Sequence, residues 1–237
     1  MHKPDSDLIR VTMVSTPDDG SCGVGTYTGS LLQAMEDLHL SHVSIHLSSL
    51  NPIHYAFKAI SAGRTVSEII HVQHEYGIFG PASIMSWVFF PVLFLVATLR
   101  RRDIIITLHS AWSREMISPP LVPLKAFYVT LNNLLLAAVA TKLVFLSDHT
   151  RDRYLNSLPI MTPETVVVPP GVPTETVEMT TRDAKQEFGY DDDDTVIVEP
   201  GYVRPEKGYD QFLAIAEALP DYEFLIGGGS PNGRSSD

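Results

Sequence analysis

Short apolar segments rich in β-branched residues alternate with segments of helical period along most of this chain. The first of them, "IRVTMVS" (9–15), is too short for a buried helix and is followed by turn residues. The pattern predicts strands at 9–15, 42–50, 67–75, 103–109, 141–147 and 164–172, with helices between them at 24–40, 53–61, 82–99 and 121–139. Continuously apolar strands separated by helices indicate an α/β fold with a doubly wound, Rossmann-like parallel sheet. In such sheets the functional crevice lies at the carboxyl ends of the strands.

The strand–helix pattern is interrupted once and then restarts. Residues 1–172 are interpreted as one Rossmann-like domain, and the polar stretch 173–194 as a linker that contains a short helix. Residues 195–237 begin a second α/β domain, with strands at 195–201 and 222–229 around a helix at 208–219. Two strands and one helix cannot bury their own faces, so we expect this second domain to be incomplete.

Composition and charge exclude several classes of protein. Hydrophobic residues make up 44% of the 237 residues and charged residues 19%, which is a globular composition. The net charge of −11 argues against nucleic-acid binding, which needs a basic surface. The acidic excess, including Asp191–Asp194, fits either a high-salt cytoplasm or an ordinary acidic protein. The single cysteine, Cys22, favours a reducing compartment, and no signal peptide is evident, so we expect a cytoplasmic location.

One apolar segment raises the question of a membrane. Residues 82–99 are apolar throughout and precede Arg100, Arg101 and Arg102. The segment is at the lower limit for a membrane span, Pro91 interrupts it, and it leads directly into a predicted strand. We therefore favour a buried crossover helix. The alternatives are a true span and a helix on the membrane surface with its arginines near anionic lipid.

The stretch "HVQHEYGIFG" (71–80) places two histidines and a glutamate at the end of a predicted strand. His71 and His74 are three residues apart and would face opposite sides of the strand, which argues against a shared metal ion. The zinc-binding helix pattern H-E-x-x-H is also absent. We expect His71 to be structural, and His74 and Glu75 to face the crevice. The alternative is that these two residues only cap the next turn.

Other strand ends carry glycines and a histidine. The loop after the first strand contains Gly23 and Gly25 and leads into a helix, whose N-terminal N–H groups would favour an anion. A simple strand-to-helix turn is the alternative for this loop. His109 stands at the end of the strand 103–109. After the fifth strand, Ser147 or Asp148 is expected to cap a helix.

In the second region, a turn between a strand and a helix carries two cations. Arg204 and Lys207 lie between Gly201 and Gly208. Two cations on a glycine-bounded turn suit a diphosphate, and a solvated turn with surface charges is the alternative.

Together these motifs resemble the retaining, nucleotide-sugar-dependent glycosyltransferases of the GT-B fold, family-four type. The resemblance covers nearly the whole chain and rests on "GVGTYT", "HVQHEYGIFG", "TLHS", "VVPPGV" and "PGYVRPEKGYDQFLAIAEAL…FLIGGG". It implies an acceptor-side N-terminal domain and a donor-binding C-terminal domain. It also implies transfer of a sugar, with retention, from a nucleotide sugar to the hydroxyl of a sugar or lipid-linked acceptor. No metal or other cofactor is implied, because cations and N–H dipoles would stabilise the leaving diphosphate.

The resemblance assigns roles at matching positions only. Gly23 and Gly25 match the glycine-rich loop that borders the donor phosphate, and His109 matches the histidine that reaches the transferred sugar. Lys207 matches the lysine that holds the donor diphosphate. Arg204 stands closer to this lysine than in many members, which have an arginine where this chain has Tyr202. His74 and Glu75 are predicted near the reacting groups.

The chain also departs from the family pattern. The later pair of glutamates, separated by seven residues, has no match in this sequence. We therefore expect little transferase activity from these 237 residues alone. The alternative function is a non-catalytic binding module, or half of a split transferase without its own donor site. The expected partners are a nucleotide sugar and an acceptor, with no nucleic acid, and with peripheral contact to the inner membrane face as a further alternative.

Overall fold

The computed structural model describes residues 9–20, 22–35, 38–46, 50–158, 163–171, 178–201, 203 and 207–229. The chain divides into two compact units, residues 1–172 and residues 173–237.

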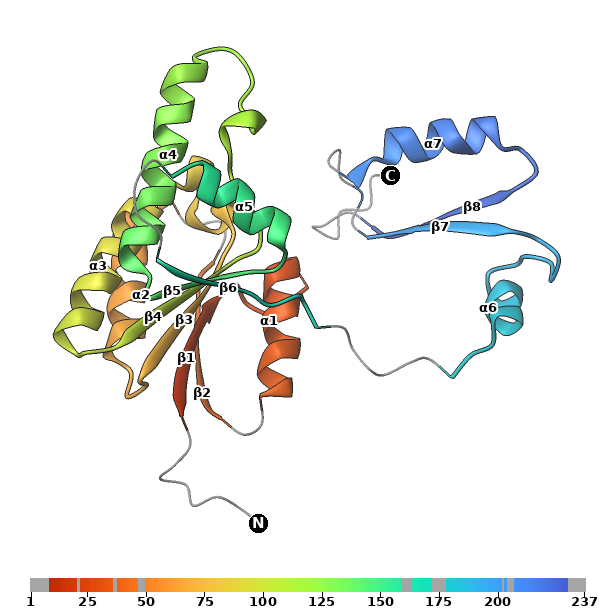
Figure 1. The fold of residues 1–237 in the computed structure, drawn as a ribbon. Coiled ribbons are helices and arrows are strands. Elements are labelled where there is room, and N and C mark those ends of the chain that lie inside the picture. Colours follow the sequence, from red (N-terminus) through yellow and green to blue (C-terminus); the bar gives the residue numbers. More distant parts are fainter. Residues whose placement is uncertain are drawn as a thin grey trace. The chain divides into compact units, whose positions relative to one another are not determined.

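The first unit is built on a six-stranded sheet in which every neighbouring pair of strands is parallel (Figure 1). Its strands are β1 (Arg10–Ser15), β2 (His39–Ser44), β3 (Ile69–His74), β4 (Asp103–Leu108), β5 (Lys142–Phe145) and β6 (Glu164–Val167). Their order is β2-β1-β3-β4-β5-β6. The chain therefore places β2 on one side of β1 and then adds β3 to β6 in turn on the other side. The predicted Rossmann-like α/β fold is confirmed.

Helices cover both faces of this sheet. The helices are α1 (Gly23–Ala34), α2 (Pro52–Arg64), α3 (Ser86–Leu99), α4 (Val122–Val139) and α5 (Asp148–Asn156), with 3-10 turns η2 (Tyr76–Phe79), η3 (Pro81–Ser83) and η4 (Arg114–Met116). Figure 1 shows α1 on one side of the sheet and α2, α3 and α4 on the other. The core lies on the α2–α4 side, where Ile70, Val72, Ile104, Ile106, Leu143 and Phe145 meet Phe89, Phe90 and Leu93.

Local capping explains several helix boundaries. Asn51 accepts a hydrogen bond from the backbone N–H of Ile53 at the start of α2, and Pro52 occupies the first helical position. The predicted cap of the α5 helix is confirmed, because the Ser147 hydroxyl accepts from the Thr150 N–H. The helix predicted at 82–99 begins only at Ser86, because residues 81–83 form η3 instead.

One buried asparagine joins the loops at the carboxyl end of the sheet. Asn133 of α4 accepts from the Tyr76 hydroxyl at 2.7 Å and donates to the Trp112 carbonyl at 3.0 Å and to Ser157 Oγ at 2.7 Å. The rings of Tyr76 and Trp112 stack with centroids 4.0 Å apart. The Tyr154 hydroxyl donates to the Asn133 carbonyl. This network fixes η2, the loop after β4 and α5 against one helix.

Helix α4 is long and apolar enough to cross a membrane by length and composition alone, and α3 is a shorter apolar helix. The inner side of α4 nevertheless packs into the core of the first unit, where Asn132, Asn133 and Leu136 are fully buried. This packing favours α4 as a core helix of the first unit over α4 as a membrane span.

The second unit contains a strand–helix–strand motif. Its elements are α6 (Thr181–Glu187), β7 (Val196–Pro200), α7 (Tyr209–Ala218) and β8 (Glu223–Gly227), and β7 pairs with β8 in parallel. Phe212 of α7 packs edge-on against Phe224 of β8, so one side of the helix is held to the sheet. The short helix predicted inside 173–194 is α6, and residues 173–177 of that segment lie outside the described residues.

We predict that Asn133→Leu lowers the free energy of unfolding by about 3 kcal/mol, because it removes three hydrogen bonds, two of them fully buried, and leaves the Tyr76 hydroxyl without its acceptor. Asn132→Leu is the matched control, since Asn132 is as deeply buried and neither of its side-chain polar atoms has a partner among the described residues. Its effect should be neutral or stabilising. Chemical denaturation measures both variants, and equal losses would contradict the role given to the Asn133 network.

Candidate functional site

The loop between β1 and α1 closes tightly over the first turn of the helix. A Cβ atom on Gly25 would overlap the Pro17 carbonyl oxygen, so only glycine fits this close approach. Gly23 faces open space instead. Cys22 occupies the N-cap position without a side-chain hydrogen bond to the helix. The first turn of α1 therefore has no side-chain cap, and the N–H groups of Gly25 and Thr26 donate to the Cys22 carbonyl.

His109 follows β4 directly and lies beside α1. Its backbone N–H donates to the His74 carbonyl at 3.0 Å, which extends the pairing of β3 with β4 by one residue. Its imidazole meets the Tyr27 ring edge-on, with centroids 5.1 Å apart. Tyr27 belongs to the same helix as Gly23 and Gly25. The structure thus brings His109 next to the helix that the glycine loop begins.

A chain of polar side chains leads from His109 along the sheet. Gln73 Oε1 lies 2.9 Å from His109 Nε2, and Gln73 Nε2 lies 3.4 Å from both His71 Nε2 and Met13 Sδ. His71 Nε2 is also 2.7 Å from Thr107 Oγ1. All five side chains are buried or largely buried. Sequence reasoning overlooked Gln73.

Met13 determines which way round the Gln73 carboxamide lies. A thioether sulfur accepts hydrogen bonds and has no proton to donate, so the Gln73 atom facing Met13 is the amide nitrogen. The amide oxygen therefore faces His109, and its contact with Nε2 requires a proton on that nitrogen. A neutral His109 consequently keeps Nδ1 as its hydrogen-bond acceptor.

Burial keeps His71 and His109 uncharged at neutral pH. Burial lowers the pKa of His109 to about 4. Burial, with a smaller contribution from His109, lowers the pKa of His71 to about 4. An imidazolium at either position would lose much of its hydration, and a charge on His109 would further disfavour a charge on His71.

Glu75 ties two strand-end loops together. Its Oε1 accepts from the Tyr76 N–H and from Ser110 Oγ, each at 2.9 Å, so the carboxylate caps η2 and holds the loop after β4. Burial raises its pKa, and these two hydrogen bonds oppose the rise. Glu75 is partly exposed. The capping alternative is therefore present in the structure, and a catalytic role for Glu75 stays a prediction.

His74 lies in the core, on the other face of β3 from His71. It is completely buried, and its ring stacks on Phe79 at 5.2 Å and meets Tyr76 edge-on at 4.8 Å. Neither ring nitrogen has a partner among the described residues, and burial lowers the pKa of His74 to about 3. These surroundings favour a packing role, and substrate contact by His74 stays a prediction.

The predicted diphosphate-binding residues belong to the second unit. Lys207 is exposed and directly precedes Gly208, which has a φ of 79° and is the N-cap residue of α7. This left-handed conformation favours glycine and turns the chain from the loop into the helix. Arg204 lies outside the described residues.

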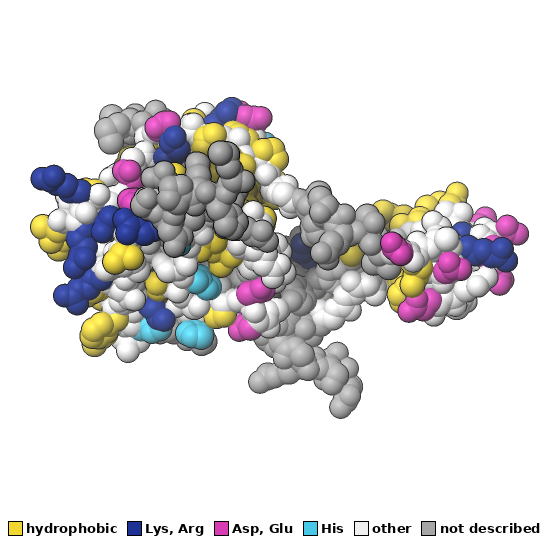
Figure 2. All heavy atoms as spheres, turned by 90° about the horizontal axis from the view of Figure 1, so that it is seen from below, with side chains coloured by type: hydrophobic (Ala, Val, Ile, Leu, Met, Phe, Trp, Pro, Cys, Tyr) yellow, Lys and Arg dark blue, Asp and Glu magenta, His cyan; other side chains and the backbone are white. Residues whose placement is uncertain are grey.

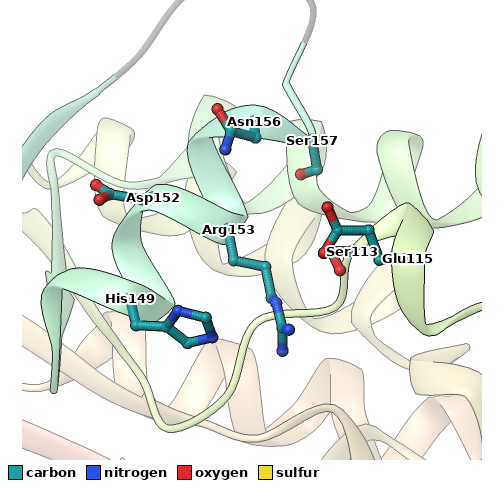
Figure 3. A pocket seen from close by; sticks show the side chains of 7 residues that line it. All are labelled: Ser113, Glu115, His149, Asp152, Arg153, Asn156 and Ser157. Atoms are coloured by element: carbon teal, nitrogen blue, oxygen red, sulfur yellow. The ribbon is translucent and has the colours of Figure 1, made fainter.

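A polar pocket of about 370 Å³ lies between α5 and the loop after β4. Figure 3 shows His149 and Arg153 extending from α5 toward the loop that carries Ser113 and Glu115. The Ser113 hydroxyl is buried without a partner among the described residues. Sequence reasoning did not find this pocket. The available signal was the run of polar residues in the helix after the fifth strand.

An apolar groove of about 670 Å³ adjoins the polar pocket. Met116 lines the groove, and its sulfur lies 3.8 Å from Arg153 Nη1, which lines the pocket. Trp112 of the groove and Ser113 of the pocket are consecutive residues. The other groove residues are mostly apolar and include Ala82, Ile117, Leu124, Tyr128 and Val129. A molecule with a polar and an apolar part would fit the two spaces together.

Among the described residues, no three His, Cys, Asp or Glu side chains are grouped so that they could hold a metal ion.

Comparison with known proteins shows a fold and no family. No family model matches the sequence, and no curated protein matches it. Among solved structures, S. aureus MnaA, determined with UDP, is similar over 95% of this chain with a TM-score of 0.51 and 13% identity. The chain spans 63% of the length of that protein. This similarity shows a GT-B-like fold.

A second solved structure is dTDP-4-dehydrorhamnose reductase from Yersinia enterocolitica, with 11% identity and a TM-score of 0.36 over 96% of this chain and 86% of the reductase. A similarity at this level carries no argument about fold or function.

We predict that His109 is neutral at pH 7, with its proton on Nε2, and becomes protonated only near pH 4. Long-range ¹⁵N–¹H NMR of histidine-labelled protein reports the proton on each ring nitrogen, and His109→Asn assigns the signal. In Gln73→Ala the Nε2–H tautomer should lose its dominance, because its acceptor is gone. A proton on Nδ1 in the unsubstituted protein would contradict the orientation derived for Gln73.

We predict that Gly25→Ala lowers the free energy of unfolding by about 2 kcal/mol, because the new methyl group must displace the backbone at Pro17. Gly23→Ala is the matched control on the same turn and should change stability by less than about 0.5 kcal/mol, since its Cβ meets open space. Denaturant titrations compare the two. A tolerant Gly25 would show that the loop does not close as described.

Proposed function

We propose that the chain is a retaining, nucleotide-sugar-dependent glycosyltransferase, or the N-terminal part of one. The observation that carries this proposal is the neutral His109, held by Gln73 at the strand ends beside the N-terminus of α1. An uncharged imidazole with a free acceptor nitrogen suits a sugar hydroxyl. An uncapped helix N-terminus behind glycines suits a phosphate.

The sugar and the phosphates of the donor have separate proposed contacts. His109 Nδ1 accepts a hydrogen bond from a hydroxyl of the transferred sugar. The N–H groups of the first turn of α1 are proposed to contact a phosphate of the donor. In the second unit, Lys207 is proposed to offer a cation that suits a diphosphate. These groups stabilise the negative charge that develops on the leaving diphosphate, without a requirement for a metal.

The proposed transfer exchanges one carbon–oxygen bond for another. The acceptor hydroxyl oxygen bonds to the anomeric carbon, while the bond from that carbon to the diphosphate breaks and its electron pair leaves with the diphosphate. The departing phosphate takes the hydroxyl proton. This scheme assigns no general base to the protein, which agrees with the capping position of Glu75 and the burial of His74.

The acceptor is proposed to have a polar head and an apolar chain. The polar pocket beside Arg153 and Ser113 offers hydrogen bonds to a head group, and the apolar groove beside Met116 and Leu124 offers space for a hydrocarbon chain. Their adjacency favours a lipid-linked acceptor over a free sugar.

The similarity of the fold to MnaA, which was determined with UDP, supports nucleotide binding by this chain. The runner-up is a non-catalytic binding module, or half of a split transferase that lacks its own donor site. The exposed Lys207, next to Gly208 at the start of α7, supports the transferase, because a cation at this position suits a diphosphate.

We predict that calorimetric titration detects binding of a UDP-sugar or GDP-sugar to the chain. Lys207→Ala should weaken binding of both the nucleotide sugar and the bare nucleotide about tenfold, because the contact is to the diphosphate. His109→Ala should weaken only the nucleotide sugar, because its contact is to the sugar. Lys185→Ala, at a half-buried lysine of the same unit on α6, serves as the control.

The same titrations separate the two functions. Absence of binding by every nucleotide and nucleotide sugar would favour the non-catalytic module. Equal weakening of nucleotide and nucleotide sugar by His109→Ala would contradict the sugar contact.

A further inference from the structure

The outer side of α3 carries apolar side chains where a soluble helix normally carries polar ones. Trp87, Phe94, Leu95 and Leu99 are exposed, and Leu99 keeps 77% of its surface accessible. Phe89, Phe90 and Leu93 on the inner side of the same helix are fully buried. Both sides of α3 are therefore apolar, and only one of them faces the core.

The two helices beside α3 repeat this feature. Helix α3 packs against both α2 and α4, and the three lie together on one side of the sheet (Figure 1). Ile53 and Phe57 are exposed on α2, and Leu124 and Phe127 on α4, with Phe57 at 66% and Phe127 at 61%. These exposed side chains, with those of α3, are called here the α2–α4 face.

Charge is distributed unevenly around this face. The chain has a net charge of −11, yet α2, α3 and α4 contain no Asp or Glu. Lys58 and Arg64 lie on α2, and Arg100, Arg101 and Arg102 follow α3 at the same end of the helical layer. Figure 2 shows Lys and Arg side chains gathered on one side of the first unit, with hydrophobic side chains between them.

We propose that the α2–α4 face rests on an anionic lipid surface. Exposed aromatic and aliphatic side chains enter the boundary between head groups and acyl chains, and the neighbouring cations meet the anionic head groups. Exposed apolar side chains gathered on three neighbouring helices mark an interaction site. The absence of carboxylates on three helices of an acidic protein is what selects an anionic partner.

The helices lie along this surface rather than cross it. Fourteen residues of α3 extend about 21 Å, which is less than the roughly 30 Å of a bilayer core. The inner side of α4 is tied to the core through Asn133. The apolar groove beside Leu124 opens next to exposed residues of the same face, so a lipid could reach it from the surface.

Protein occupants fit this face less well. A second copy of the chain docked through the same face would offer these cations no carboxylate from α2, α3 or α4, since the three helices contain no Asp or Glu. The surface contact does not require the proposed transferase activity, and its test uses no sugar nucleotide.

The test is co-sedimentation of the full chain with vesicles. We predict binding to vesicles of equal parts phosphatidylglycerol and phosphatidylcholine, and weak binding to phosphatidylcholine alone. Binding should fall when NaCl rises from about 0.1 M to about 1 M, which shortens the Debye length from about 10 Å to about 3 Å. Arg100→Gln/Arg101→Gln should weaken binding about tenfold through lost head-group attraction.

Phe94→Gln/Leu95→Gln should weaken binding by a similar factor through lost insertion. The matched control is Arg182→Gln/Leu213→Gln, the same exchanges at exposed positions of the second unit, and it should bind like the unsubstituted chain. Circular dichroism checks that every variant is folded. Absence of binding to anionic vesicles, or equal binding by all variants, would overturn the proposal. So would a dimer in analytical ultracentrifugation that the face variants dissociate while no vesicle binding occurs.

Discussion

The alternation of side chains along β3 and β4 is the constraint on which the site depends. Strands β3 and β4 pair in parallel, with Ile69 opposite Asp103 and His74 opposite Leu108. Successive residues of each strand therefore point to opposite faces of the sheet. Even-numbered positions enter the apolar core beneath α2 and α3. Odd-numbered positions form the polar chain of His71, Gln73, Thr107 and His109 on the opposite face. One buried sheet thus holds an apolar core on one face, and on the other a hydrogen-bonded series of polar side chains that ends at His109, just after β4.

Hydrogen bonds join the core of the first unit to the loops at the carboxyl end of its sheet. The network around Asn133 holds η2, the loop after β4 and α5, and these segments also carry Glu75, the polar pocket and one wall of the apolar groove. Buried hydrogen bonds of this kind are costly to break, so these loops are fixed by the core rather than by contacts within the loops. The polar groups on these loops are therefore held in place by the packing of the first unit.

Much of the fold follows from sequence periodicity, and less of the site does. The parallel sheet and its helices were predicted, but the helix predicted at 24–40 ends at Ala34, because residues 39–44 pair with β1 as a strand. Strand periodicity correctly separated His71 from His74. The same periodicity, applied one step further, groups His74 with Ile70 and Val72 in the core and Gln73 with His71, yet His74 was predicted to face the crevice. The orientation of Gln73 depends on Met13, sixty residues away, which no local pattern reveals.

The proposed function requires contact between a sugar and His109 Nδ1, just after β4. The most direct measurement follows both ring nitrogens of His109 by ¹⁵N NMR while a nucleotide sugar, and separately the bare nucleotide, is added. The account predicts that the nucleotide sugar moves the Nδ1 resonance toward that of a hydrogen-bonded nitrogen, that Nε2 keeps its proton, and that the bare nucleotide leaves Nδ1 unchanged. An Nδ1 resonance that does not respond to a bound nucleotide sugar, or that responds equally to the bare nucleotide, would contradict it.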